Sequence, residues 1–151
     1  MQLSLHADYA LRVLIYAGAH PATTVTTQQI SDAYGISRNH LVRVVHTLDE
    51  QGYVKVTQGR SGGLSLAKLP AEIHLGQVVR HAEPNLRLVE CFDRATNTCP
   101  IIDTCGLKAP LRKALDAFLK ELDKYTLADL LDGPRGAQMT QALVQLGPKN
   151  T

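Results

Sequence analysis

The chain lacks tryptophan, has only two phenylalanines, and contains no apolar run long enough to span a membrane as a helix. Its first residues do not show a basic segment followed by an apolar core, so we predict no secretory signal. These absences argue against a membrane protein or a membrane partner, and we expect the protein to stay in the cytoplasm. Because thiols are kept reduced there, its three cysteines are not expected to form a structural disulfide.

The residue patterns of common enzymes are also missing. The sequence shows no Ser/His/Asp arrangement, no phosphate-binding glycine loop and no pair of acidic residues suited to a cleft. We therefore predict that the protein is not an enzyme.

What is present is an ordinary globular composition of 151 residues, 44% apolar and 20% charged. The formal net charge is only +2, but the charge is unevenly distributed. Between residues 38 and 68 acidic residues are few, and the basic residues are Arg38, Arg43, Lys55, Arg60 and Lys68. A local basic face suits a modest DNA binder, although an ordinary solvated face would carry the same charges.

The first half of the sequence predicts three helices and a β-hairpin. The helices are expected at about 4–19, 26–34 and 38–51. Thr26 and Gln29 form a capping-box pattern, Gly35 ends the second helix, and Ser37 caps the third. Residues 53–57 and 64–67 predict two short strands joined by a glycine-rich turn. Helix–turn–helix followed directly by a hairpin is the order of a winged helix.

The second half predicts a short helix at about 75–82, an irregular cysteine-containing segment, and a longer helix from Pro110 to about Tyr125. Apolar residues follow a heptad spacing along this helix: Leu111, Leu115, Phe118, Leu122 and Tyr125. The stripe could face its own domain's core, but we favour a homodimer, because small repressors usually read two half-sites. A last short helix begins at Thr126, and Gly133-Pro134 closes it.

We therefore predict a mainly α fold with a small β-hairpin, in four parts. A winged helix-turn-helix DNA-binding domain covers 1–84, and a cysteine loop that binds a cluster covers 85–108. A dimerisation helix with a short terminal helix covers 109–132, and a weakly structured tail covers 133–151.

The residues that we expect to contact double-stranded operator DNA lie at the start of the recognition helix and at the wing tip. An arginine can fork onto guanine and an asparagine onto adenine, while a helix N-terminus seats a phosphate. The candidates are Ser37, Arg38, Asn39, His40, Arg43 and Arg60. A winged domain that binds protein instead is the alternative reading.

Three cysteines lie close together in one polar segment: Cys91, Cys99 and Cys105 are separated by seven and five residues. This spacing in a reduced compartment indicates a metal centre. A structural zinc site would need a fourth ligand, for which His74 and His81 are available, but no Cys-x-x-Cys clamp is present. Three inert thiols would fit poorly in so polar a loop. An iron–sulfur cluster, held mainly by thiolates, would leave one coordination position for another ligand.

Together these features resemble the IscR-like superfamily of iron–sulfur regulators, over about residues 1–132. The residues that carry the resemblance are DYALR at 8–12, YGISRNHL at 34–41, GRSGG at 59–63 and ELDKYTLADL at 121–130. The regulator that gives the superfamily its name has a histidine three residues beyond its last cysteine, where this chain has Lys108. That departure favours the nitric-oxide-sensing repressors of the superfamily.

The resemblance implies that Cys91, Cys99 and Cys105 bind an iron–sulfur cluster, with 4Fe-4S preferred and 2Fe-2S as the alternative. It also implies that Asp8, from the other subunit, completes the coordination. The other role for Asp8 is an ion pair with Arg12, four residues further along the helix. The implied function is a nitric-oxide-sensing repressor that binds operator DNA with the cluster intact and releases it on cluster nitrosylation.

Three alternatives remain at this point. An iron–sulfur regulator could sense redox state or iron supply, and a zinc-stabilised winged-helix regulator could sense another signal. A small electron-transfer protein would leave the DNA-binding pattern without a use.

Overall fold

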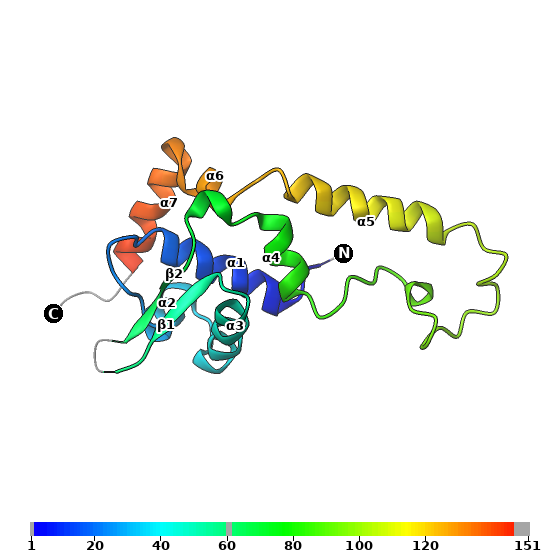
Figure 1. Ribbon diagram of the computed structural model, residues 1–151, viewed down its shortest axis with the longest axis horizontal. Helices are drawn as coiled ribbons and strands as arrows, with labels where there is room; N and C mark the ends of the chain where they lie inside the picture. The colour runs from blue at the N-terminus through cyan, green and yellow to red at the C-terminus, as the bar shows by residue number, and fades with distance from the viewer. Residues whose placement is uncertain (1, 60–61, 147–151) are drawn as a thin grey trace.

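The computed structural model describes residues 2–59 and 62–146 of the chain. Its elements follow one another in a single run from α1 to α7 (Figure 1). In chain order they are α1 Leu5–Gly18, α2 Thr27–Tyr34, α3 Arg38–Glu50, β1 Val54–Thr57, β2 Gly63–Leu66, η1 Pro70–Glu72, α4 Leu75–Ala82, η2 Glu90–Phe92, α5 Lys108–Leu122, α6 Leu127–Leu131 and α7 Gly133–Leu146. No helix within these ranges has both the length and the apolar character needed to cross a membrane.

The turn between α2 and α3 is defined by local hydrogen bonds. Thr26 Oγ1 accepts the Gln29 N–H at 3.1 Å, and Gln29 Oε1 accepts the Thr26 N–H at 2.7 Å, which is the predicted capping box. Gly35 ends α2 with a φ of +66°, a left-handed conformation that glycine adopts without steric cost. Ser37 then caps α3, so this part of the prediction is confirmed.

The two strands form an antiparallel hairpin in which Val54 pairs with Leu66 and Thr57 pairs with Gly63. Val54 and Leu64 are buried, whereas residues 55–57 are exposed. The hairpin therefore packs on the helices through Val54 and Leu64. The order α1-α2-α3-β1-β2 confirms the predicted winged helix and the mainly α fold class.

Helix α1 runs through the centre of the apolar core and contacts α3, α4, α6 and β2. Small residues on its buried face let neighbouring helices approach closely. Leu14 of α1 is fully buried, and the fully buried side chains around the helix include Ile30, Leu41, Leu48 and Ile73. This core is continuous across α1–α4, which makes the DNA-binding unit a rigid support for α3.

Residues 83–122 leave this core as an arm, made of the cysteine segment and α5 (Figure 1). Leu115 and Leu119 of α5 are buried against Val79 of α4, so part of the apolar stripe faces its own chain. Of the predicted heptad positions, Leu115 is buried, while Tyr125 is 46% exposed and lies beyond the helix. Leu119 is a buried residue that the heptad pattern did not include.

The predicted ends of this helix are wrong by two or three residues, because α5 begins at Lys108 and ends at Leu122. Pro110 is its third residue, still within the first turn, where the missing proline N–H has no helical partner to lose.

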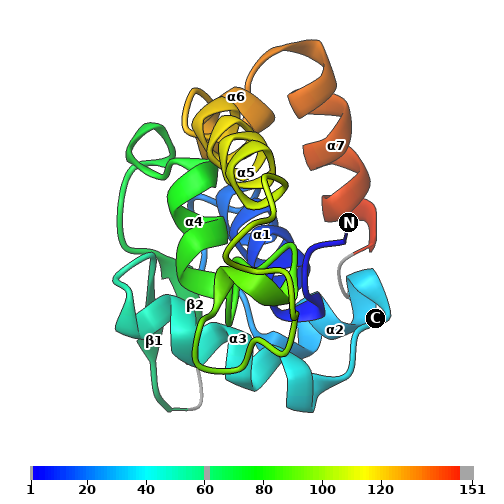
Figure 2. The ribbon, with the colours of Figure 1, turned by 90° about the vertical axis from the view of Figure 1, so that its right-hand side faces the viewer.

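The predicted weakly structured tail is wrong for residues 133–146, which form α7. Gly133-Pro134 closes α6, as expected, but it also starts the next helix. Gly133 has a φ of +71°, which turns the chain sharply, and Pro134 suits the first helical turn. Leu143 is buried and Met139 packs against the main core, and α7 descends toward α2 (Figure 2).

Candidate nucleic-acid interface and cysteine loop

The N-terminal turns of α3 present the predicted DNA-reading residues to solvent. Leu41, Val44, Val45 and Leu48 hold the opposite face of the helix in the core. Ser37 Oγ accepts the His40 N–H at 3.4 Å and fixes the start of the helix. The residues left exposed on this helix start are Ser37, Arg38, Asn39, His40 and Arg43. The structure thus brings these five together on one surface.

Val42 belongs to the same exposed surface, and sequence reasoning missed it. Its side chain is 53% exposed, which is unusual for an apolar residue on a helix with a well-formed buried face. The signal was available, because Val42 falls out of step with the buried positions of α3. An exposed methyl pair on a recognition helix is suited to contact the methyl group of thymine.

Arg60, the predicted wing-tip contact, lies outside the described residues, as does Ser61. The contact of Arg60 with DNA therefore stays a prediction. On β1, the strand before the wing tip, Lys55 is exposed.

Asp8, on the first turn of α1, forms a two-point ion pair with Arg12. Arg12 Nη2 lies 2.8 Å from Asp8 Oδ2, and Arg12 Nε donates to Asp8 Oδ1 at 3.2 Å. The Arg12 guanidinium also lies 5.8 Å from the centre of the Tyr34 ring, at the helix-turn-helix turn. Burial raises the pKa of Tyr34 to about 12, although the Arg12 charge acts in the opposite direction. In the single chain Asp8 therefore takes the ion-pair role.

The three cysteines are free and half-buried, all in the segment between α4 and α5. Across the ranges 2–59 and 62–146, no three His, Cys, Asp or Glu side chains are gathered closely enough to hold a metal ion. The structure therefore places the predicted thiols on one loop but does not bring them, or Asp8, to a common point.

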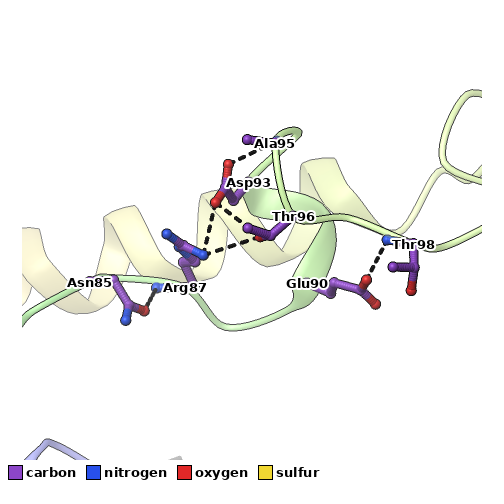
Figure 3. A network of polar contacts seen from close by, with 7 residues as sticks. All are labelled: Asn85, Arg87, Glu90, Asp93, Ala95, Thr96 and Thr98. Atoms are coloured by element: carbon purple, nitrogen blue, oxygen red, sulfur yellow. Dashed lines mark hydrogen bonds and ion pairs between the residues drawn. The ribbon is translucent and has the colours of Figure 1, made fainter.

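Side chains hold the first part of this loop in shape (Figure 3). The Glu90 carboxylate accepts the Thr98 N–H, and Asp93 accepts from both the Ala95 N–H and the Thr96 hydroxyl at 3.0 Å. Arg87 Nη1 lies 2.9 Å from Asp93 Oδ2. Hydrogen bonds from Thr98 lower the pKa of Glu90, and the bond from Ala95 lowers that of Asp93, so both carboxylates are ionised at neutral pH.

The chemistry of the loop fits a group bound by thiolates. Cys105 Sγ accepts the Leu107 N–H at 3.5 Å. The buried Asn97 Oδ1 has no hydrogen-bond partner in the part of the chain that the structure describes. Three cysteine sulfur atoms in a polar loop, with one buried oxygen that lacks a hydrogen-bond partner among the described residues, are compatible with an iron–sulfur cluster.

A compact joint connects the end of the arm to the DNA-binding domain. Arg80 of α4 donates to both carboxylate oxygens of Asp123, at 2.6 and 2.8 Å, and these bonds lower the pKa of Asp123. Gly76 lies beneath them, and a Cβ at that position would overlap Asp123 Oδ1. Main-chain bonds from Leu75 to Tyr125 and from Leu127 to Ile73 complete the connection. We call Gly76, Arg80 and Asp123 the joint.

Comparisons with known proteins agree with this architecture. The Rrf2 family, described as "Iron-dependent Transcriptional regulator", matches residues 3–133. A regulator named HTH-type transcriptional regulator NsrR from Geobacillus kaustophilus is 48% identical over 133 residues, covering 87% of this chain and 90% of the relative. Its namesake from Halalkalibacterium halodurans is 44% identical over 149 residues, covering 98% of this chain and 100% of the relative.

A solved structure titled "T. potens IscR" is 25% identical, with a TM-score of 0.69, and covers 87% of this chain and 86% of that one. The chain therefore belongs to the Rrf2 family of transcriptional regulators, in the part of that family that contains the NsrR regulators.

Proposed function

We propose that this protein is a cytoplasmic transcriptional repressor that senses nitric oxide. A homodimer binds double-stranded operator DNA while an iron–sulfur cluster is intact, and it releases the DNA when the cluster has reacted with nitric oxide. The observation that carries the proposal is the presence, in one short chain, of an exposed recognition-helix surface and a loop with three free thiols. The similarity to regulators named NsrR supports the same assignment.

On the DNA side, Arg38, Asn39 and Val42 read base edges, because they lie exposed on the first turns of α3. Ser37 and the free N–H groups at the helix start seat a phosphate. His40, Arg43 and Arg60 add contacts to the DNA backbone. One winged helix covers only one half-site, and this is why a dimer is required.

On the sensing side, Cys91, Cys99 and Cys105 hold the cluster, with 4Fe-4S preferred over 2Fe-2S. When bound, the cluster would supply a group that reacts directly with nitric oxide. The resemblance to the iron–sulfur regulators implies Asp8 of the other subunit as the fourth ligand, and the Asp8 carboxylate is partly exposed on the first turn of α1.

The chain itself provides a route from Asp8 to the DNA-reading surface. Asp8 is held by Arg12, whose guanidinium lies over Tyr34 at the turn before α3. Helix α1 also packs directly on α3 through its buried face. A change in the partner of Asp8 therefore acts on α1 and on the turn after Tyr34, which together set the position of α3.

The test is an anaerobic titration of nitric oxide into the cluster-loaded protein bound to DNA. The DNA is selected by the protein from a random-sequence library, so that no operator has to be assumed. We expect the absorbance of the cluster to change and DNA affinity to fall at least about tenfold, which corresponds to about 1.4 kcal/mol. DNA affinity that stays constant while the cluster absorbance changes would refute the sensing role.

A further inference from the structure

The two intervals between the cysteines are closed by different chemical groups. Between Cys99 and Cys105 the backbone forms successive turns, because Ile102 N donates to Cys99 O at 3.4 Å and Cys105 N donates to Ile101 O at 2.8 Å. Such main-chain bonds depend little on which side chains are present. Between Cys91 and Cys99 the backbone bonds of the described residues reach only as far as Asp93, whose N–H donates to Glu90 O at 3.1 Å, and side-chain carboxylates close the rest of the interval.

Glu90 makes the long-range closure. Its carboxylate accepts the N–H of Thr98, eight residues further along the chain. Glu90 is the neighbour of Cys91, and Thr98 is the neighbour of Cys99. One hydrogen bond therefore ties the backbone beside the first thiol to the backbone beside the second (Figure 3).

Asp93 shapes the chain inside that closure. It accepts the Ala95 N–H and the Thr96 hydroxyl, which turns the chain back on itself directly after Cys91. Arg87 neutralises this carboxylate at 2.9 Å and also lies 3.4 Å from the Thr96 hydroxyl. Arg87 thus connects the start of the cysteine loop to the turn formed by residues 93–96.

The loop is also fixed to the arm helix. The Arg112 guanidinium of α5 lies 4.0 Å from the centre of the Phe92 ring, next to Cys91. Phe92 packs as well against the small apolar cluster formed by Val79, Leu115 and Leu119. The Cys91 end of the loop therefore has a defined place on α5, and closing the loop brings the Cys99 end to that place.

We propose that Glu90 and Asp93 are positioning residues that close the Cys91–Cys99 interval before any cofactor is bound. They touch no reacting atom; they remove part of the chain entropy that cluster binding would otherwise have to overcome. The inference rests on the proposed function for the identity of the cofactor, but the closure itself is a property of the apo-protein.

The test measures thiol proximity in the full-length apo-protein, kept reduced and free of metal. Dibromobimane, a short cross-linker that joins two thiols, is added, and peptide mass spectrometry quantifies each cysteine pair. Three variants are compared with the parent: Glu90→Ala, which removes the acceptor; Glu90→Gln, which keeps an amide oxygen for the Thr98 N–H; and Asp93→Ala.

A matched control is Glu72→Ala. Glu72 Oε2 accepts the Leu69 N–H at 3.0 Å, so this change breaks an exposed carboxylate bond of the same type outside the loop. The yield of the Cys91–Cys99 product relative to the Cys99–Cys105 product is expected to fall roughly threefold in Glu90→Ala and in Asp93→Ala, the effect of one modest hydrogen bond. Glu90→Gln and Glu72→Ala are expected to match the parent.

A parent-like product ratio in both Glu90→Ala and Asp93→Ala would overturn the inference. A ratio that falls equally in Glu90→Gln would overturn the role of the hydrogen bond. A second readout is the rate at which the reconstituted protein loses iron to a chelator, which is expected to rise in Glu90→Ala and to be restored in Glu90→Gln. If the parent takes up no iron and sulfide, the proposed function fails, while the cross-linking comparison still decides the closure.

Discussion

The DNA-binding domain and the arm differ in what holds them in shape. The domain buries large side chains, such as Leu41, Leu48 and Tyr53, in a core to which α1–α4, α6, α7 and the hairpin all contribute. The arm buries Leu115 and Leu119 against Val79, and its loop relies on exposed hydrogen bonds and ion pairs. The comparison teaches that the DNA-binding domain is held mainly by apolar burial, whereas the loop of the arm is held mainly by polar contacts at the surface.

The largest expected effect comes from the core of the DNA-binding domain. Leu41→Ala should lower the free energy of unfolding by about 3 kcal/mol, because a fully buried leucine leaves a cavity. Leu115→Ala in the arm should cost less, about 2 kcal/mol, since most residues packed in its small apolar cluster are only partly buried. Urea unfolding followed by circular dichroism measures both. Equal losses of unfolding free energy in the two variants would contradict the difference between the two regions.

The next effect concerns the joint. Gly76→Ala would push a Cβ against Asp123 Oδ1, so we expect a loss of about 2 kcal/mol in unfolding free energy. Gly106→Ala is the matched control, because a Cβ there would meet nothing within 4 Å. It should leave stability unchanged. A Gly76→Ala protein as stable as the parent would show that the arm and the domain are not held together at this point.

A smaller effect tests whether the reader works independently of the arm. Arg38→Ala should weaken binding to a selected DNA by about tenfold and relax its sequence preference, because one base contact is lost. Arg135→Ala on α7 removes the same charge elsewhere and should change neither. Electrophoretic mobility shifts on matched and altered sites provide the measurement. Unaltered preference in Arg38→Ala would remove this residue from base reading.

The smallest effect is a pH dependence of the joint. Hydrogen bonds from Arg80 hold the pKa of Asp123 below its ordinary value of about 3.9, so its stabilising contribution is fully present above that value. It is lost as pH falls through the lower pKa of the folded protein. Thermal unfolding of the parent and of Asp123→Asn, followed from pH 7 downward, should show the two curves converge in acid. A constant separation would contradict this assignment.

Local signals in the sequence were sufficient for the DNA-binding domain. The Thr26–Gln29 capping box, Gly35 and Ser37 each act within a few residues, so their effect can be predicted without knowing the fold. The exposed DNA-reading surface followed from the same helix boundaries. Val42 was recoverable from that pattern, although it was overlooked.

The arm and the tail could not be predicted to the same extent, because their contacts are distant along the chain. The bond from the Thr98 N–H to the Glu90 carboxylate and the pairing of Arg80 with Asp123 have no local signature. Gly133-Pro134 can end one helix and also begin another. Whether a helix follows depends on the burial of Leu143 in the core, which is a contact distant along the chain. The approach of the cysteines to Asp8 needs a second subunit and remains a prediction.

The attachment of the arm has a consequence for how such regulators can be rebuilt. The chain leaves α4 after Ala82, where Glu83 accepts the Ser4 N–H at 2.7 Å, and it returns to the opposite end of α4 at the joint. The two attachment points are thus separated by one eight-residue helix, about 12 Å long. A foreign segment could be grafted between them, provided that its ends span that gap, that Gly76, Arg80 and Asp123 are retained and that it covers Val79 as Leu115 and Leu119 do.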